Sequence, residues 1–423
     1  MTATVILGAQ WGDEGKGRVT DYFAESAEFV VRYQGGNNAG HTIIIGEEKF
    51  ALSLVPSGVM NQNAVPIIGC GAVVDPAVLL DEMEMLRSRG VDPSKLLIDS
   101  AAHLIMPYHR ALDEVLEARR GDANLGTTKK GIGPAYQDKF ERAGLRMQDL
   151  LDPGHFRALL KNRVAEKNHV FTSAYGLEPF DAEVIADHYL EMAETLRPYI
   201  ADTTIVLHNA SKAGQNILFE GAQGTLLDIN HGTYPFVTSS SPTAGGVTTG
   251  TGLGPKAIDE IVGVSKAYIT RVGSGIFPTE LFDEDGVTMV NLGHEYGVVT
   301  GRRRRPGWLD LVSLRYAARI NSLTGIFLTK LDILSAFNEI KLANGYMLDG
   351  EVITEFPRDQ RELARVSPIY ETFPGWKSDV TGARHWDDLP SEAQSYIKYI
   401  EKAIDTPIRW ISVGPERQQL LER

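Results

Sequence analysis

The chain has 423 residues, 43% of them hydrophobic, and a formal net charge of −13. Its length and composition are typical of one large globular domain or two or three ordinary ones, and its acidity argues against nucleic acid as the main partner. No stretch approaches the roughly 18 uninterrupted apolar residues of a membrane span, and the N-terminus lacks the basic and apolar regions of a signal peptide. The single cysteine, Cys70, has no intramolecular partner, which favours a cytoplasmic location.

One type of junction recurs along the chain: a short β-branched or aromatic run followed by a polar loop that carries glycine or charge. The predicted strands are 4–7, 29–33, 216–219, 326–329 and 408–412, and the loops that follow them are 8–17, 34–41, 220–224, 330–332 and 413–416. Helix signals lie between them, including an N-cap with a following proline at Asp75 and a capping-box pattern at Ser391. Strands that alternate with helices predict a largely parallel sheet, at whose carboxyl edge the loops gather.

The loop Gly8–Gly17 has the composition of a phosphate cradle. Its glycines let backbone N–H groups approach an anion, Lys16 adds a cation, and a helix beginning near Arg18 adds a positive end. It is not a Walker A sequence, because Gln10 replaces the first glycine and Gly17 replaces the hydroxyl residue that binds magnesium.

Two carboxylates, Asp13 and Glu14, lie inside this phosphate-type loop. An ordinary turn without a ligand would explain the glycines, but it does not explain these acids. A carboxylate repels phosphate unless it binds a cation or takes a proton. Asp13 is therefore the first candidate for a chemical role.

The loop 34–41 combines amide side chains, glycines and His41. A lone histidine is more often structural than catalytic, but its place in a second glycine loop favours a chemical role. The loop 330–332, Lys-Leu-Asp, resembles the guanine-reading Asn-Lys-x-Asp element of GTPases, with Thr329 in the Asn place. The carboxylate of Asp332 suits guanine, because guanine offers two N–H donors where adenine offers an acceptor and no 2-amino group. The alternative is a polar turn after a strand.

Four consecutive arginines, 302–305, stand out in this acidic chain. A solvated basic patch is the ordinary interpretation of such a run. Here the run adjoins a glycine loop, which suits bidentate capture of carboxylates and phosphates. The Ser-, Thr- and Gly-rich segment 238–255 is interpreted either as a flexible linker or as a mobile loop over the substrate, and its ordered flanks favour the loop.

These elements together resemble the adenylosuccinate synthetase family nearly end to end. Two long signatures, 8–17 and 131–142, carry the resemblance, and 37–41, 220–223, 329–332 and 412–415 support it. The resemblance implies an α/β fold with a large, mostly parallel central sheet flanked by helices, similar to P-loop NTPases and with helical subdomains. It implies a single synthetase domain over residues 1–423, with a helical insertion at roughly 100–200 packed on the sheet.

The resemblance also implies a magnesium-dependent ligase of purine biosynthesis that joins IMP to L-aspartate as GTP becomes GDP and phosphate, the first committed step from IMP to AMP. The expected protein is a homodimer. Asp13 is implied as the base that takes the N1 proton of IMP, so that O6 attacks the γ-phosphate and forms 6-phosphoryl-IMP. His41 is implied as the partnering acid and Gln223 as a further catalytic residue, before the amine of aspartate displaces phosphate.

Binding residues are implied residue by residue. Magnesium, one ion per subunit, goes to Asp13 and the carbonyl of Gly40. GTP goes to Gly12, Glu14, Gly15, Lys16, Gly17, Arg18, Gly40, His41, Thr42, Arg304, Lys330, Leu331, Asp332, Ser412, Val413 and Gly414. IMP goes to Asp13, Glu14, Gly15, Lys16, Asn38, Ala39, Gly40, His41, Thr128, Gln223, Thr238 and Arg302, with Arg142 supplied to the partner subunit's site. Aspartate goes to Val298, Val299, Thr300, Gly301, Arg302, Arg303 and Arg304.

One position departs from the family pattern. The family commonly has Thr-Thr-Gly-Arg where this chain has Val299-Thr300-Gly301-Arg302, so one hydroxyl at the expected aspartate site is missing. Two alternatives to the synthetase are another GTP- or ATP-dependent ligase on a similar sheet and a regulatory nucleotide-binding protein without net chemistry. A regulatory switch needs neither the pair of Asp13 and His41 nor an arginine-rich loop, which disfavours it.

Overall fold

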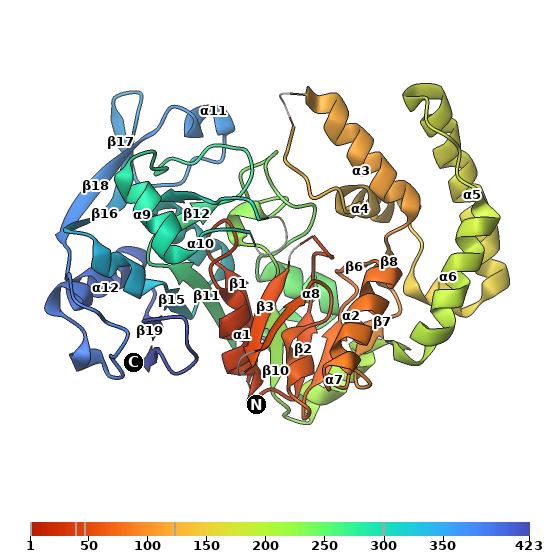
Figure 1. Ribbon diagram of the computed structural model, residues 1–423, viewed down its shortest axis with the longest axis horizontal. Coiled ribbons are helices and arrows are strands. Elements are labelled where there is room, and N and C mark those ends of the chain that lie inside the picture. Colours follow the sequence, from red (N-terminus) through yellow and green to blue (C-terminus); the bar gives the residue numbers. More distant parts are fainter. Residues whose placement is uncertain (1, 39, 46–47, 122–123, 298–300) are drawn as a thin grey trace.

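The computed structural model describes residues 2–38, 40–45, 48–121, 124–297 and 301–423. Its centre is a ten-stranded sheet with the strand order β20-β19-β15-β11-β1-β10-β2-β5-β7-β9 (Figure 1). The strands are β1 (Ala3–Gly8), β2 (Phe29–Arg32), β5 (Val65–Ile68), β7 (Leu97–Asp99), β9 (Ile200–Ala201), β10 (Ile217–Glu220), β11 (Glu260–Lys266), β15 (Gly325–Thr329), β19 (Ile408–Ser412) and β20 (Leu420–Glu422). Neighbouring strands are parallel except β19 and β20, which are antiparallel. The predicted α/β class with a mostly parallel sheet is confirmed.

The central strands are buried on both faces, which explains their continuous apolar runs. Every residue of β1, β10 and β15 is buried. A parallel strand covered by helices on both sides has no polar face, so it appears in the sequence as an uninterrupted hydrophobic segment. All five predicted strands are present in this sheet and run in one direction, so the loops after them emerge at one edge.

Helices cover the sheet and extend the molecule to both sides. They are α1 (Lys16–Ala24), α2 (Pro76–Ser88), α3 (Pro107–Arg120), α4 (Ile132–Glu141), α5 (Pro153–Val170), α6 (Ala182–Leu196), α7 (Thr203–Lys212), α8 (Gly245–Thr251), α9 (Glu284–Gly293), α10 (Leu311–Asn321), α11 (Gln360–Leu363) and α12 (Ser391–Ile404). The predicted N-cap is confirmed, since the Asp75 side chain accepts a hydrogen bond from the N–H of Val78. The capping box predicted at Ser391 is wrong: Pro390 is the N-cap of α12 and makes no side-chain cap bond.

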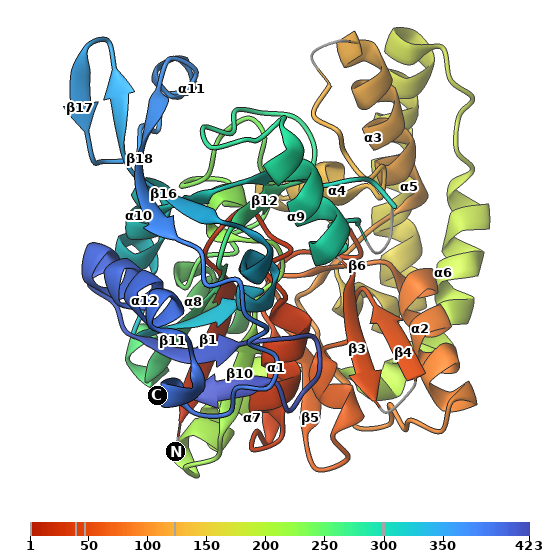
Figure 2. The ribbon, with the colours of Figure 1, turned by 60° about the vertical axis from the view of Figure 1, so that its left-hand side comes forward.

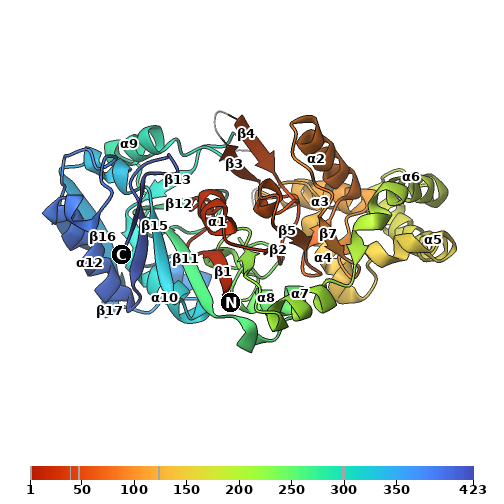
Figure 3. The same cartoon turned by 90° about the horizontal axis from the view of Figure 1, so that it is seen from below.

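The two ends of the molecule differ in architecture. Seen from below, the large sheet runs through the middle, with β16 and α12 at one end and α5 and α6 at the other (Figure 3). The α5 and α6 end is held by an apolar core that includes Phe156, Leu160, Tyr189 and Leu196. Among the helices of the described residues, none is long and apolar enough to cross a membrane.

Shorter sheets complete the fold, and the hairpin of β16 and β17 projects from the molecule beside β18 (Figure 2). The remaining strands are β3 (His41–Ile45), β4 (Glu48–Leu52), β6 (Val73–Val74), β8 (His103–Leu104), β12 (Ile269–Arg271), β13 (Arg305–Gly307), β14 (Leu309–Asp310), β16 (Glu339–Leu348), β17 (Glu351–Ile353) and β18 (Ser367–Pro374). The segment 238–255 is not a plain loop, because it contains α8. The N–H of Ala244, the N-cap of this helix, donates to Oδ1 of buried Asn321.

Candidate active site

The loop Gly8–Gly17, called the phosphate loop below, follows β1 and leads into α1. Asp13 adopts a left-handed backbone with φ 60°, a conformation that costs an ordinary residue about 1 kcal/mol or more and is common at functional sites. The end of β15 contacts this loop, because the hydroxyl of Thr329 donates to the carbonyl oxygen of Glu14 at 2.7 Å. The loop predicted to hold phosphate therefore adjoins the strand predicted to present the base-reading residues.

The two carboxylates of the phosphate loop have different surroundings. The Glu14 side chain is fully buried and accepts hydrogen bonds from the N–H groups of Gln10 at 3.1 Å and Gly12 at 2.8 Å. Lys16 balances its charge, with Nζ 2.7 Å from Oε2. The Asp13 side chain is 39% exposed. Glu14 thus shapes the loop from inside, whereas Asp13 is directed to where a ligand can reach it.

Arg304 connects Asp13 to the arginine loop, defined here as residues 301–305. Its Nε donates to Oδ2 of Asp13 at 2.8 Å, and its Nη1 donates to Oε2 of Glu295 at 2.6 Å. Burial alone would lower the pKa of Arg304, but the carboxylates of Asp13 and Glu295 outweigh it and raise that pKa. Two segments separated by 291 residues therefore meet at a charge-assisted contact.

An amide cluster lies beside the phosphate loop, formed by the side chains of Gln34, Asn38 and Gln223 with the hydroxyls of Thr238 and Ser240. Gln223 Nε2 donates to Asn38 Oδ1 at 3.2 Å, and Gln34 Nε2 donates to Gln223 Oε1 at 2.7 Å. Gln34 also donates to Ser240 Oγ, which lies 3.5 Å from the hydroxyl of Thr238. Three predicted IMP residues, Asn38, Gln223 and Thr238, are thus joined, and the arrangement offers the neutral donors and acceptors that a heterocycle edge requires.

The residues predicted to read guanine lie at the end of β15. Lys330 has φ 65° and donates from Nζ to the carbonyl of Gly293 at 2.9 Å. Burial raises the pKa of Asp332, and the cationic side chains of Lys330 and Arg18 oppose that rise. Leu331, between Lys330 and Asp332 in the chain, is buried.

Arg18 joins helix α1 to the loop after β19. Its guanidinium donates to Ser412 Oγ and the carbonyl of Gly414, and further to the carbonyls of Glu416 at 2.5 Å and Gln419 at 3.0 Å. Ser412 and Val413 are buried. The predicted GTP residues of the N-terminal helix, of the β15 end and of the C-terminal loop are therefore neighbours.

The segment 125–131, which carries Thr128, is held by acidic side chains of α3 that the sequence analysis missed. The Glu117 carboxylate accepts from the N–H groups of residues 125, 126 and 127 at 3.2, 2.5 and 3.0 Å, and Asp113 accepts from the N–H of Gly131 at 3.0 Å. A Cβ on Gly126 would lie 3.7 Å from Nη1 of Arg302, so this segment faces the arginine loop. The one available sequence signal was the i, i+4 spacing of the two acids.

Several predicted residues are not brought into these contacts. Arg142 is exposed at the C-cap of α4 with φ 66°, and no side-chain hydrogen bond or ion pair joins it to the other predicted site residues that the structure describes. Ala39 and Val298–Thr300 lie outside the described residues, and for His41 and Thr42, at the start of β3, the structure describes the backbone alone. Within the described ranges, no group of three or more His, Cys, Asp or Glu side chains could hold a metal.

The chain is similar to known proteins over its whole length. The adenylosuccinate synthetase family model matches residues 5–421. The chain is 53% identical over 422 residues to adenylosuccinate synthetase of Heliobacterium modesticaldum and 52% identical over 421 residues to that of Carboxydothermus hydrogenoformans, covering 100% of this chain and 99% of each relative. A solved structure of fully ligated adenylosuccinate synthetase from Plasmodium falciparum superposes with a TM-score of 0.94 at 38% identity, over all of both chains. Cyanophage S-2L succinoaminodeoxyadenylate synthetase, at 19% identity and a TM-score of 0.59 over 100% of this chain and 95% of the phage protein, shares the fold.

Proposed function

Because the chain belongs to the adenylosuccinate synthetase family, we propose that its active site is the junction of the phosphate loop, the amide cluster and the arginine loop. The protein is a ligase of AMP biosynthesis that joins IMP and L-aspartate into adenylosuccinate, and its family uses GTP. The observation that carries the residue roles below is the contrast within the phosphate loop, where Glu14 is buried and neutralised and Asp13 is accessible.

Asp13 is the general base. It takes the N1 proton of IMP, the electrons move to O6, and O6 attacks the γ-phosphorus of GTP, so that GDP leaves and 6-phosphoryl-IMP forms. His41 donates a hydrogen bond to the transferring phosphoryl group, where charge develops. The neutral amine of aspartate then attacks C6, the C6–O6 bond breaks and phosphate leaves with O6. The new C–N nitrogen gives up one proton to solvent, and adenylosuccinate remains.

Magnesium fits the residues present. Mg²⁺ usually takes one or two protein oxygens and completes its coordination with phosphate oxygens and water. The exposed carboxylate of Asp13, with the carbonyl of Gly40, would supply such a set. When bound, one ion per subunit would neutralise charge on the transferring phosphates. This chain would hold the ion with Asp13, while Lys16 and the N-terminus of α1 bind the phosphates.

The substrates divide among the surrounding elements. The base of IMP binds at Asn38, Gln223 and Thr238, and Thr128 and Arg302 bind its polar groups, which the hydrogen-bonded amide cluster and the approach of Arg302 to Gly126 support. GTP is read by Lys330, Asp332 and the 412–414 loop. Aspartate is held by residues 298–304, whose arginines suit its two carboxylates.

The assembly is a cytoplasmic homodimer of one-domain chains, 1–423, in which α3–α6 form the helical insertion. Arg142 enters the partner subunit's IMP site. Its exposure at the end of α4, two residues after Phe140, which is 76% exposed, supports a covered surface there.

The decisive test is the substrate dependence of GTP use. We expect phosphate release from GTP when IMP and aspartate are both present, and background release when either is omitted. Product absorbance in a coupled assay measures the ligation itself. Equal turnover with ATP would contradict the role of Asp332, and GTP use without aspartate would contradict the assignment of the whole site.

Subunit sharing has its own test. Mixing Asp13→Asn with Arg142→Leu chains creates hybrid dimers that contain one site with neither substitution, so partial activity should return. The control mixes each variant with itself. Absence of recovery despite subunit exchange, followed with two differently tagged chains, would contradict the sharing of Arg142.

A further inference from the structure

We propose that Glu295 is a positioning residue for the ligation, which holds Arg304 in place beside the reacting groups while Lys266 balances its charge. The proposal rests on the proposed function, because it acts through Arg304. Neither Glu295 nor Lys266 belongs to a motif that the sequence analysis recognised.

Glu295 is fully buried and surrounded by donors. Both of its carboxylate oxygens lie 2.8 Å from Lys266 Nζ, and the hydroxyl of Tyr268 donates to Oε1 at 2.5 Å. Arg304 Nη1 donates to Oε2 at 2.6 Å. Burial works to raise the pKa of Glu295, but Lys266, Arg304 and Tyr268 lower it to about 2, so Glu295 stays charged at any working pH.

Glu295 also holds Arg304 through the backbone. The N–H of Arg304 donates to the carbonyl of Glu295 at 2.8 Å, and the N–H of Gly297 donates to the carbonyl of Arg302 at 2.8 Å. These bonds join residues 295 and 297 to residues 302 and 304. Arg304 is thus fixed at both its main chain and its guanidinium by one residue.

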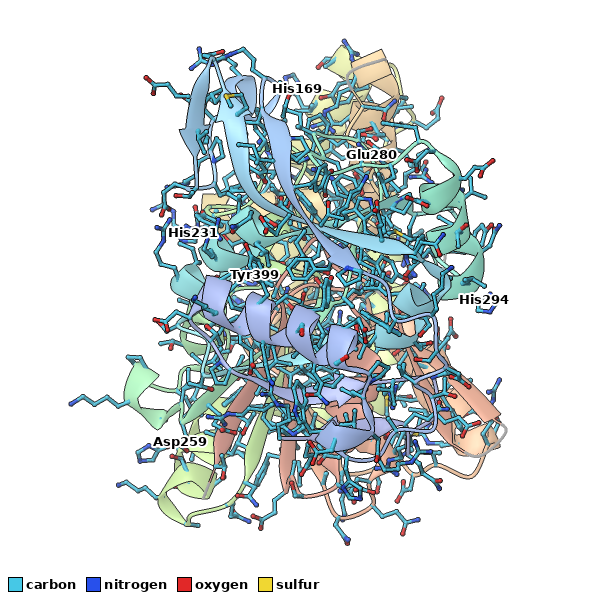
Figure 4. The ribbon with its side chains drawn as sticks, turned by 90° about the vertical axis from the view of Figure 1, so that its left-hand side faces the viewer. His169, His231, Asp259, Glu280, His294 and Tyr399 are labelled. Atoms are coloured by element: carbon cyan, nitrogen blue, oxygen red, sulfur yellow. The ribbon has the colours of Figure 1, made fainter. Side chains whose placement is uncertain are left out.

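Glu295 is buried between two exposed neighbours, His294 and Tyr296. His294 is exposed and lies at the edge of the molecule in Figure 4, with a left-handed φ of 48°. Glu295 is directed inward to Lys266, the last residue of β11. The carboxylate is therefore tied to the end of a strand of the central sheet.

The contacts form a closed ring that begins and ends on the phosphate loop. The side chain of Gln10 accepts from the Lys266 N–H at 3.2 Å and donates to the Tyr268 carbonyl at 3.1 Å. The ring continues from Lys266 through Glu295 and Arg304 to Asp13. The ring contains two cations and two anions, of which Asp13 has the most exposed side chain.

The contact with Glu295 determines where Arg304 lies when Asp13 binds its ligands. A guanidinium held by Asp13 alone would lose its place at that moment. Held by Glu295 as well, Arg304 keeps its position and turns its remaining donors to the substrate anions. Displacement of a catalytic group by about 1 Å can slow a reaction about 100-fold, so this second anchor matters for rate.

A purely structural role is the alternative, since removing one partner of a buried ion pair destabilises a protein. The test therefore separates stability from rate with three variants. Glu295→Gln leaves the Lys266 ammonium without its carboxylate, Lys266→Met leaves Glu295 on Arg304, and the double variant removes both charges. Glu284→Gln, an exposed glutamate on α9, is the matched control.

We expect Glu295→Gln to lower kcat about 10- to 100-fold and to raise KM for aspartate about tenfold, with KM for IMP within about twofold of wild type. The double variant should regain thermal stability without regaining kcat, and Lys266→Met should keep kcat within about fivefold. If kcat returns together with stability in the double variant, Glu295 is structural and the proposal fails.

A double-mutant cycle with Arg304→Leu completes the test. If Glu295 acts through Arg304, Glu295→Gln should change kcat by less than about twofold in the Arg304→Leu background. A further tenfold loss there would overturn the proposal. Near wild-type activity of Arg304→Leu would instead contradict the role of Arg304 in the proposed function, so the two failures are distinguishable.

Discussion

Two charge clusters, each built around a buried carboxylate, lie in different halves of the molecule. Only one of them reaches a ligand loop. The nucleotide-side cluster is the series of ion pairs from Lys266 through Glu295 and Arg304 to Asp13. The helical-side cluster is Asp138 of α4, contacted by His109 Nε2 of α3 at 2.9 Å and by Lys167 Nζ of α5 at 2.5 Å. In each cluster a buried carboxylate lies between two nitrogen groups.

The clusters differ in what they connect. The helical-side cluster joins three helices, and Asp138 and His109 are each 1% exposed. The nucleotide-side cluster ends on Asp13, which is 39% exposed and lies in the phosphate loop. A buried ion pair by itself is weak evidence of function. An accessible end in a ligand loop is what distinguishes the two, so we expect substitutions to affect rate on one side and stability on the other.

The largest expected effect is that of Asp13→Asn at the accessible end. Asparagine tolerates the left-handed backbone of this position, so folding should be kept. Loss of the base and of the metal carboxylate should lower kcat at least about 1,000-fold. Steady-state kinetics measures the loss, and nucleotide binding by calorimetry should change much less. A kcat within threefold of wild type would remove Asp13 from the role of base.

The next effect concerns guanine recognition at Asp332. Asp332→Asn replaces an acceptor of two N–H groups with an amide, so KM for GTP should rise about 100-fold. Xanthosine triphosphate carries a 2-oxo group that the new amide can donate to, and it should become the better substrate. The ratio of the two kcat/KM values measures the switch. An unchanged ratio would show that Asp332 does not contact the base.

The sequence predicted the parts of the molecule whose signals are local. Buried parallel strands appear as apolar runs, and the cap at Asp75 depends on a residue three positions away. The capping box at Ser391 failed because Pro390 occupies the N-cap, and α8 was missed because Ser, Thr and Gly rank low as helix formers outside tertiary packing.

The site residues Lys266 and Glu295 were not predicted for a different reason. Lys266 and Glu295 are 29 residues apart, and each is unremarkable in its own segment: a lysine ends an apolar strand and a glutamate follows a helix. Their meaning comes from a fold that brings them within 2.8 Å. The phosphate loop was recognisable because its glycines, Lys16 and Asp13 are adjacent in sequence, whereas a contact between distant segments leaves no local pattern.

On the helical side, Lys167→Met should reduce the free energy of unfolding by about 2 kcal/mol, because it removes one cation from a buried carboxylate. We expect kcat to stay within about twofold of wild type, since this cluster ends on helices and not on a ligand loop. Urea unfolding and steady-state kinetics measure the two quantities. Lys161→Met, an exposed lysine on the same helix, is the control. A tenfold loss of kcat without loss of stability would erase the distinction between the clusters.

The smallest expected effect is a pH dependence of stability from His103, next to the helical-side cluster. Burial, with Lys139 and Arg146 nearby, lowers the pKa of His103 to about 4. The folded state therefore binds this proton less readily than the unfolded chain, whose histidine pKa is about 6.5. Its stabilising contribution is complete above pH 6.5 and is lost as the pH falls toward 4.

Between pH 7 and pH 5 the wild type should lose about 1 to 2 kcal/mol more unfolding free energy than His103→Gln, which carries no titrating ring. Urea unfolding at the two pH values measures the difference, with the exposed His188→Gln as the control. Equal losses in wild type and His103→Gln would mean that His103 takes up its proton without unfolding. The helical half would then tolerate a buried positive charge beside Lys139. Its stability would depend less on charge balance than we expect for the helical-side cluster.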